Sequence, residues 1–405
     1  MSKNEKSTFS SNSGSMFHIF LESELMETIK HIQKNENLKN EGEVITHLIE
    51  NYVKKNVTQQ NQIKHEISKA TFDESKYQSS MVRVGDLEFD GNIQFQKLEK
   101  ILAQVTSENL IKKLPQHKIY GLSGVGMIHR FHTKIFPVKF SLMCLSRMIE
   151  EADNPWISLT ELKRYTLHSA KTFLEKFNLS PIENKFKINA GFPNQEPKLD
   201  VNEEDWLSYA RSSKRFTEQF VGRKLQKHEG IQMGGALFEM GLIEAKTPNF
   251  DEDEIVGGSR DSKIGKIYLT LSENGKEFVS YKNELINFIY NSKQNEPDSI
   301  FSQQEREFYF KKILPGYKFE NDFVAYLMKH EQIEHTQEIK TWFKEKFLKF
   351  CNSEFPDVEV TLKDNDVRMY SNTIMNRLME FGVFAKEPKS KSGPYTRMQN
   401  VGNLL

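Results

Sequence analysis

The sequence predicts a mainly helical α+β protein with small β wings, built from several short units. Three observations support this prediction. Apolar residues recur at helical spacing through most of the 405 residues, and turn residues such as Asn154 and Pro155 divide these stretches into short helices. Stretches that alternate like strands are few and short. An arrangement of helix, glycine and short strand occurs twice, at Gly241 and at Gly382.

Composition limits the class of protein. Lys plus Arg and Asp plus Glu each number 56, so the net charge of zero indicates no partner, and basic surfaces must be sought segment by segment. Cys144 and Cys351 form no disulfide framework, and no apolar run reaches the roughly 18 residues that span a bilayer. We therefore expect a cytoplasmic protein with no membrane partner, beginning with a disordered polar arm at residues 1–15.

Residues 16–56 predict a strand, a helix, a tight turn and a second helix. Residues 16–21 alternate like a strand, and Asn40 is a candidate N-cap with Glu43 three positions later. A unit of this size cannot bury its apolar faces alone, so we expect two copies to pair.

The segment FHIFLESELMETIKHIQKNENLKNEGEVITHLIENYVKK, residues 17–55, resembles the Arc/MetJ-type ribbon-helix-helix family. The resemblance implies a homodimer whose paired strands enter the major groove of double-stranded DNA, while the second helix begins at a phosphate. By position, Met16, His18 and Phe20 would face the bases, and Asn40 and Gly42 would bind the phosphate. Only His18 among the three strand residues offers a hydrogen bond, so the alternative is that this unit only dimerises the chain.

Residues 57–115 are expected to form a linker and a connecting helix at 95–114. A first downstream unit is expected at 116–200, with a helix at 137–151, a cap at Ser158, a turn near Leu167 and His168, and a recognition helix at 169–177. This arrangement would place three basic side chains near DNA, unless it is an ordinary helical bundle with a solvated basic face. They are Lys163, Arg164 and Lys171.

A second unit, 201–295, contains the most basic stretch. We expect a helix at 206–228, then a helix that ends at Gly241, a strand, the loop 251–266, another strand and a helix capped by Ser272. This order resembles winged-helix transcription factors, and it implies DNA contacts from the basic helix and from the loop as a wing. The candidates are Arg211, Lys214, Arg215, Arg223, Lys224, Lys227, Arg260, Lys263 and Lys266. A solvated charged face is the alternative.

A third unit of the same kind is expected at 296–405. Helices are predicted at 302–314, 319–330 and 335–353, followed by a helix that begins at Ser371, a strand and a short wing turned at Gly393 and Pro394. Asn pairs with adenine and Arg with guanine in DNA grooves, which makes this helix a candidate reading element. The candidates are Asn372, Asn376, Arg377, Lys389, Lys391 and Arg397.

We find no catalytic constellation and expect no cofactor or metal. His129, Arg130 and His132 lie close together in the sequence, but no paired cysteine motif completes a tetrahedral site with Cys144. The leading hypothesis is a dimeric DNA-binding protein that regulates transcription and is not an enzyme. The alternatives are a scaffold or DNA-partition adaptor that uses winged helices to bind a protein partner, and the recognition subunit of a restriction-type nuclease.

Overall fold

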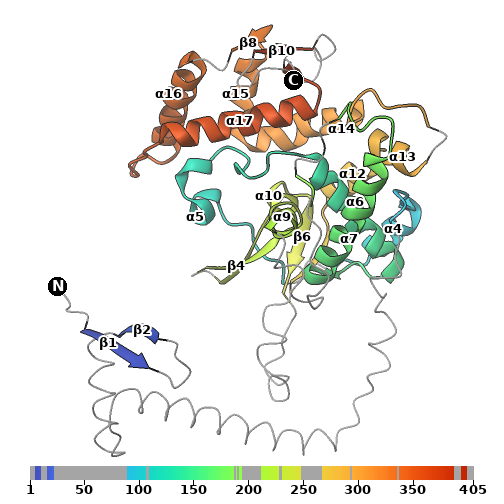
Figure 1. Cartoon of the computed structure of the whole chain (residues 1–405), viewed down its shortest axis with the longest axis horizontal. Coiled ribbons are helices and arrows are strands. Elements are labelled where there is room, and N and C mark those ends of the chain that lie inside the picture. Colours follow the sequence, from blue (N-terminus) through green and yellow to red (C-terminus); the bar gives the residue numbers. More distant parts are fainter. Residues whose placement is uncertain are drawn as a thin grey trace, which may run out of the picture. The chain divides into compact units, whose positions relative to one another are not determined.

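The computed structural model describes residues 5–10, 16–21, 89–105, 109–186, 188, 191–193, 211–227, 230–247, 267–291, 294–334, 337–386 and 394–398. The chain divides into two compact units, and all described residues from Phe89 onward belong to the second. The described residues combine helices with short strands, as the sequence predicts (Figure 1).

The first unit contains a β-hairpin. Strand β2 (Met16–Leu21) lies where the sequence predicts a strand, and it pairs antiparallel with β1 (Glu5–Ser10). Residues 5–10 are therefore a strand, where we expected a disordered arm, and β2 pairs within the chain, where the family resemblance implies pairing with a second copy. The two helices expected at 22–56 lie outside the described residues.

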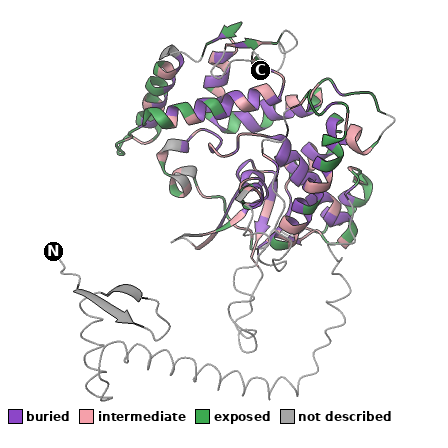
Figure 2. Ribbon diagram, in the orientation of Figure 1, coloured by how far each residue is buried: buried purple, intermediate pink, exposed green. Residues whose placement is uncertain are grey.

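Helix α6 (Phe136–Ala152) is the centre of the second unit. Most of its side chains are buried, and most of the helix is purple in Figure 2. It begins with Pro137 at a first-turn position, as expected. Helix α4 (Phe95–Leu102) packs against it through Leu98 and Ile101, but ends well before the expected residue 114. The five-residue helix α5 (Gln116–Tyr120) and the 3₁₀ turn η1 (Leu122–Gly124) connect α4 to α6.

Helix α7 (Leu159–Asn178) corrects our prediction of a helix-turn-helix. Ser158 caps it as expected, accepting a hydrogen bond from the backbone N–H of Glu161 at 3.2 Å. It then continues through the expected turn at Leu167 and His168. The segment contains no glycine or proline, and Leu167 and Ala170 continue its buried face, so nothing interrupts the helix.

A three-stranded sheet joins distant parts of this unit. Strand β7 (Tyr268–Leu271) lies between β3 (Ile157–Ser158) and β6 (Ile243–Lys246), antiparallel to both. The boundary expected at residue 200 is therefore wrong, because β3 before it and β6 and β7 after it form one sheet.

The basic stretch predicted as one helix at 206–228 divides into three elements. Helix α9 (Arg211–Phe216) continues as a π-helical turn, η2 (Thr217–Val221), and ends at Gly222. Strand β4 (Arg223–Lys227) then pairs with β5 (Gly230–Gly234), so these basic residues lie on a hairpin. The alternating pattern of RKLQK suits a strand as well as a helix, which explains the error.

Five helical segments follow β7 in the described part of the chain. Helix α12 (Glu273–Ser280) is capped by Ser272 as expected, and α13 (Glu284–Tyr290) by Asn283. Helix α14 (Gln303–Phe308) begins with a full capping box and leads into the π-helical turn η4 (Tyr309–Ile313) and the 3₁₀ turn η5 (Leu314–Gly316). Phe278 of α12 stacks on Phe308 of α14 with ring centroids 4.9 Å apart.

The C-terminal part has the helices predicted there. Helix α15 (Lys318–Leu327) is followed by β8 (Gln332–Ile333), α16 (Gln337–Glu354), α17 (Asp364–Glu380), β9 (Phe384–Lys386) and β10 (Tyr395–Arg397). Helix α17 begins at Asp364, earlier than the predicted start at Ser371. Strand β10 lies between β8 and β9. In this sheet, as in β3-β7-β6, the strand that comes last in the sequence is therefore the central one.

The repeated helix-glycine-strand pattern gives the same local structure twice. Helix α10 (Ala236–Glu239) ends at Gly241 (φ 68°), with Leu242 N–H bonded to Leu237 C=O at 3.0 Å. Helix α17 ends at Gly382 (φ 70°), with the equivalent bond from Val383 to Leu378 at 2.8 Å. Both are Schellman caps, whose left-handed position favours glycine. The residue after the last strand of each sheet bonds to the residue after the glycine. The Ser272 N–H donates to the Leu242 carbonyl, and the Met398 N–H donates to the Val383 carbonyl.

Candidate functional site

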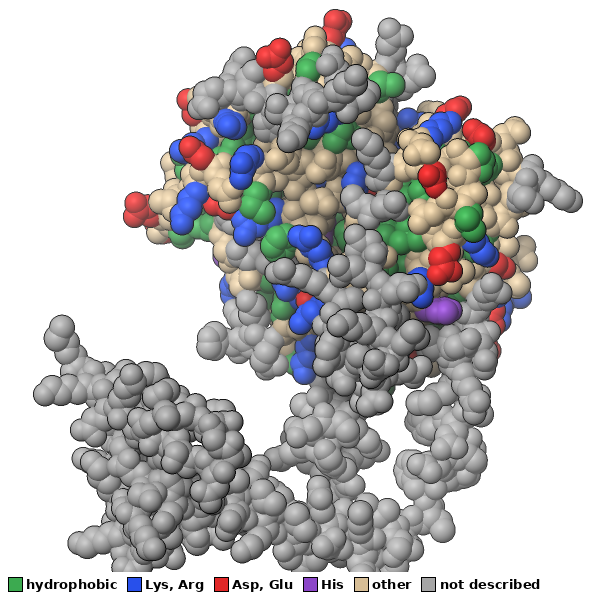
Figure 3. Space-filling model, viewed as in Figure 1, with side chains coloured by type: hydrophobic (Ala, Val, Ile, Leu, Met, Phe, Trp, Pro, Cys, Tyr) green, Lys and Arg blue, Asp and Glu red, His purple; other side chains and the backbone are tan. Residues whose placement is uncertain are grey.

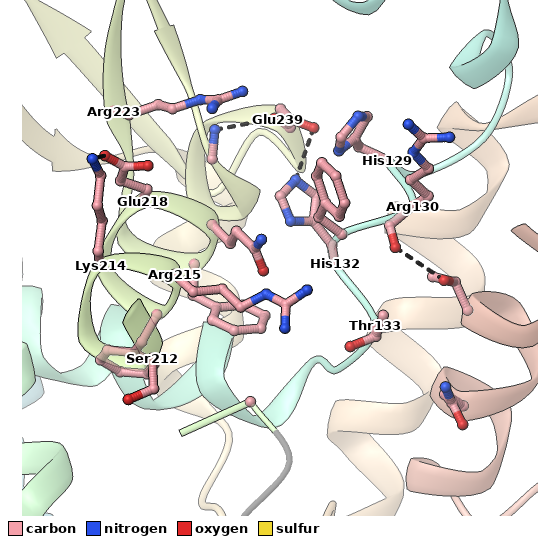
Figure 4. A pocket seen from close by; sticks show the side chains of 18 of the residues that line it. His129, Arg130, His132, Thr133, Ser212, Lys214, Arg215, Glu218, Arg223 and Glu239 are labelled. Carbon is pink, nitrogen blue, oxygen red and sulfur yellow. Dashed lines mark hydrogen bonds and ion pairs between the residues drawn. The ribbon is translucent and has the colours of Figure 1, made fainter. Parts of the chain in front are cut away.

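A cavity of about 960 Å³ lies between two helices from distant parts of the sequence. Its walls come from α9 with η2, from α17, from the start of β4 and from the segment 129–133, which turns at Arg130 and Phe131 and leads into α6 (Figure 4). The segment 129–133 is central, because its side chains form one side of the cavity while its backbone is held by α17.

The cavity has more basic than acidic side chains. Lys214 of α9 lies 3.9 Å from Glu218, and Arg130 pairs at 2.7 Å with Asp366 at the start of α17. Neither the Arg215 nor the Arg223 guanidinium forms an ion pair with any residue that the structure describes. Two arginines thus face the cavity without a neutralising carboxylate from the described part of the chain.

Two buried residues, His132 and Glu239, form the floor. Their side chains are only 3% and 4% exposed, and His132 Nε2 lies 2.9 Å from Glu239 Oε2. The other carboxylate oxygen accepts the Gly235 N–H at 3.0 Å. The Glu239 carbonyl also accepts a hydrogen bond from the Tyr317 hydroxyl at 2.7 Å and one from Lys113. Glu239 is therefore fixed by its neighbours and in turn fixes the orientation of the His132 ring.

A buried ion pair holds the segment 129–133 in place. Arg377 of α17 and Glu320 of α15 are 2.5 Å apart, and both side chains are 1% exposed. Arg377 donates a second hydrogen bond to the His132 carbonyl at 2.7 Å, and Glu320 accepts the Ile128 N–H at 2.9 Å. The Thr373 hydroxyl donates to the Arg130 carbonyl at 3.0 Å. These contacts position the wall of the cavity before any ligand binds.

The local charges also affect His129, whose ring centroid lies 5.7 Å from that of His132. Burial, and then the neighbouring His132, lower the pKa of His129 to about 4, and Arg130 and Arg223 act in the same direction. His129 is consequently neutral near pH 7, and the positive charge of the cavity comes from its Lys and Arg side chains.

The structure brings together five of the residues predicted to contact DNA. Lys214 and Arg215 of α9 are exposed, Arg223 is half-buried, Asn372 of α17 is exposed and Asn376 is half-buried, and all five line the cavity. Lys224 is exposed on the hairpin beside the cavity.

Other predicted residues lie elsewhere. Lys163, Arg164 and Lys171 are half-buried on the continuous helix α7 and do not line the cavity, and burial lowers the pKa of Lys163. Arg397 of β10 donates to the Met328 carbonyl. Arg377 was expected to face bases, but its burial and its ion pair with Glu320 make it a structural residue.

Several predicted positions cannot be compared with the structure. The strand β2 contains Met16, His18 and Phe20, but their side chains lie outside the described part of the chain, as do those of Arg211 and Lys227. The following residues lie entirely outside it: Asn40, Gly42, Arg260, Lys263, Lys266, Lys389 and Lys391.

Sequence reasoning missed His132, Glu239 and Arg130 as a group. We considered His132 and Arg130 only as part of a metal site with Cys144, but the Cys144 thiol is fully buried within α6. Among the described residues, no group of three or more His, Cys, Asp and Glu side chains has the arrangement of a metal site. None of the described helices has the length and apolar character required to cross a membrane.

No protein-family model matches this chain, and neither a curated protein nor a solved structure matches it.

Proposed function

We propose that this chain binds double-stranded DNA, as a regulator of transcription, through α17 and the basic rim of the cavity. One observation carries the proposal. Lys214, Arg215 and Arg223 come from one stretch of sequence and Asn372 and Asn376 from another, yet all five line the same cavity. Basic side chains bind phosphates, and asparagine amides can pair with base edges, so the two sets together suit a DNA site.

The order of elements supports the same proposal. Helix, strand, two helices, strand, wing and strand is the order of winged-helix domains, and α15, β8, α16, α17, β9 and β10 follow it. The part from α6 to β7 follows a related order, with α9, η2, the β4–β5 hairpin and α10 in place of a single third helix. In such domains the helix before the strand pair enters the major groove, and this helix is α17 here.

The exposed face of α17 suits this role. Asn365, Arg368 and Asn372 are exposed at helical spacing, and Met369 and Asn376 beside them are half-buried. Arg368 donates to the Asn365 side chain at 2.9 Å, which leaves further guanidinium donors for a phosphate or a base. We assign base contacts to Asn372 and Asn376, and phosphate contacts to Lys214, Arg215 and Arg223.

The surface charge is compatible with a polyanion. On the face shown in Figure 3, Lys and Arg side chains extend from the region of α16 and α17 toward β4. Phosphate contacts provide most of the affinity of DNA-binding proteins and make it sensitive to salt. We extend the proposal to a homodimer in the cytoplasm, because residues 16–56 resemble a dimerising family.

The test is an electrophoretic mobility shift with a pool of random-sequence duplexes at about 50 mM salt, where nonspecific phosphate contacts are strong. We expect the full chain to retard duplex DNA. The double variant R215Q/R223Q should bind at least about tenfold more weakly and lower the slope of log affinity against log salt by about 0.9 for each lost phosphate contact.

A matched control separates these contacts from overall charge. K311Q/K312Q removes the same charge from exposed side chains of η4, outside the cavity, and should bind duplexes like the unchanged chain. Absence of any shift at low salt would refute the proposal. Equal weakening by both double variants would refute the assignment of the cavity rim.

A further inference from the structure

The floor of the cavity has features that duplex binding at the rim does not use. Its volume of about 960 Å³ is within the range of about 300–1,000 Å³ that small-molecule and cofactor sites occupy. His132 is 2% exposed and Glu239 is 3% exposed, whereas Lys214, Arg215 and Asn372 at the rim are exposed. A compact ligand therefore suits the floor better than the side of a duplex.

His132 presents one fixed nitrogen to such a ligand. Because Glu239 holds Nε2 and Arg377 holds the backbone carbonyl, neither the ring nor its backbone is free to turn. The remaining ring nitrogen, Nδ1, is buried and has no hydrogen-bond partner among the described residues. Figure 4 shows this nitrogen turned away from Glu239, on the side of Arg215. A buried polar atom without a partner is uncommon, and one within a cavity indicates a ligand.

The charges specify the type of ligand. Arg215 and Arg223 have no carboxylate partner among the described residues, and in Figure 4 their guanidinium groups lie on opposite sides of the His132 ring. Two unpaired arginines complement a group with about two negative charges, and the planar guanidinium matches phosphate oxygens. With Nε2 bonded to Glu239, Nδ1 is the ring nitrogen of His132 that is left to bond to the phosphate.

The upper wall suits a base attached to that phosphate. The Phe131 ring is half-exposed in the cavity, with the Arg130 guanidinium 5.5 Å from its centre and the His129 ring 5.0 Å away. Aromatic side chains of this kind stack with nucleobases. Asn372 and Asn376 of α17 also line the cavity and provide amides that can bond to a base edge.

We propose that the cavity binds a nucleoside monophosphate. The phosphate is held by His132 Nδ1 and Arg215, Arg223 adds positive charge from the other side of the His132 ring, and the base contacts Phe131 and the α17 amides. Glu239 is a positioning residue for His132. The same chemistry is present in a free nucleotide and in the 5′-phosphorylated end of a single DNA strand, and the experiment distinguishes them. The site shares Arg215, Arg223 and the amides of Asn372 and Asn376 with the DNA rim, but it does not require duplex binding.

The test is isothermal titration of the full chain, without duplex DNA, by four deoxynucleoside monophosphates, the corresponding nucleosides and inorganic phosphate. We expect at least one monophosphate to bind at least tenfold more tightly than its nucleoside and than phosphate. Short single strands with and without a 5′ phosphate form the second arm. Tighter binding of the phosphorylated strand than of the free monophosphate identifies a strand end as the ligand, and the reverse identifies a free nucleotide.

Two histidine variants test the role of the floor. H132Q keeps an amide where Nε2 bonds to Glu239 but has no group at Nδ1, so the monophosphate should bind at least tenfold more weakly while the nucleoside is unaffected. H168Q changes an exposed histidine on α7 and should bind like the unchanged chain. Circular dichroism of each variant confirms that it is folded, and R215Q, on an exposed side chain, provides a second measure of phosphate binding.

Absence of monophosphate binding at millimolar concentration, or equal affinity of a folded H132Q, would overturn the assignment. The two proposals fail separately. A chain that binds monophosphates and no duplex contradicts only the proposed function, and one that binds duplexes and no monophosphate contradicts only the nucleotide site.

Discussion

Removing one charge from the buried pair of Glu320 and Arg377 should destabilise the second unit strongly. The carboxylate and guanidinium are 2.5 Å apart and 1% exposed, so neither group can be hydrated where it lies. In E320Q the side chain keeps its size, but the Arg377 charge loses its counterion. Removing one partner of a buried pair costs about 3–5 kcal/mol, mostly because the remaining charge is buried and unpaired.

The pKa of Arg377 reflects the same balance. Burial alone would lower it, but Glu320 and Tyr309 together more than offset this effect and raise it. We therefore expect urea unfolding of E320Q to show a free energy of unfolding lower by about 3–5 kcal/mol. The double variant E320L/R377M removes both charges and should cost less than E320Q alone, because no unpaired charge remains.

The comparison of single and double variants is the decisive measurement. If E320Q loses less than about 1 kcal/mol, as exposed ion pairs do, the pair is not buried as we describe it. If the double variant is the less stable of the two, the cost comes from packing or from the lost hydrogen bonds to Ile128 and His132, and the reasoning from charge is wrong. The exposed pair of Lys318 and Glu354, at 3.2 Å, is the control, and K318Q should change stability by under about 1 kcal/mol.

Two further predictions concern stability. Folding lowers the pKa of His129 from 6.5 to about 4, so the unfolded chain binds more protons than the folded chain between these pH values. The folded state is therefore more stable above pH 6.5 and loses about 3 kcal/mol of this stability as the pH falls to 4. Unfolding of H129Q at several pH values should lack this loss, and an unchanged pH profile would contradict it. Nothing lies within 4 Å of a Cβ added at Gly241 or Gly382, so G241A and G382A should each lower the free energy of unfolding only by the left-handed backbone strain, about 1–2 kcal/mol. A loss near zero in thermal unfolding would show that the caps are not as described.

The features that the sequence predicted correctly are local. Ser158 and Ser272 cap helices because a hydroxyl at that position bonds to an N–H three residues later, and this depends on nothing distant. Gly241 and Gly382 end helices for a similarly local reason. The incorrect predictions needed information from elsewhere. Whether residues 223–227 form a helix or a strand depends on pairing with 230–234, and the turn expected near Leu167 assumed a boundary that packing does not impose.

The candidate site was predicted in part for the same reason. Lys214 and Arg215 were identified because consecutive basic residues at helical spacing are visible in any sequence. The contact between His132 and Glu239 joins residues 107 positions apart, and no local pattern indicates it. One weak signal is visible in the sequence: Glu239 and Glu380 each lie two residues before the glycine that ends a helix, Gly241 and Gly382. Both glutamates are buried in the structure.

The zero net charge is compatible with a basic site because acidic and basic residues are distributed differently between the interior and the surface of the described part of the chain. Among the described residues, five glutamates are buried, at positions 150, 239, 305, 320 and 380, against only two buried cations, Lys139 and Arg377. Four of these glutamates have clear structural partners. Glu305 pairs with Lys139 at 3.1 Å, Glu320 pairs with Arg377, Glu239 fixes His132, and Glu380 accepts the Ile135 N–H at 2.5 Å. Three of the four anchor the segment that forms the cavity wall. Among the described residues, acidic side chains thus stabilise the interior more often than basic ones, and this burial removes more negative than positive charge from the described surface.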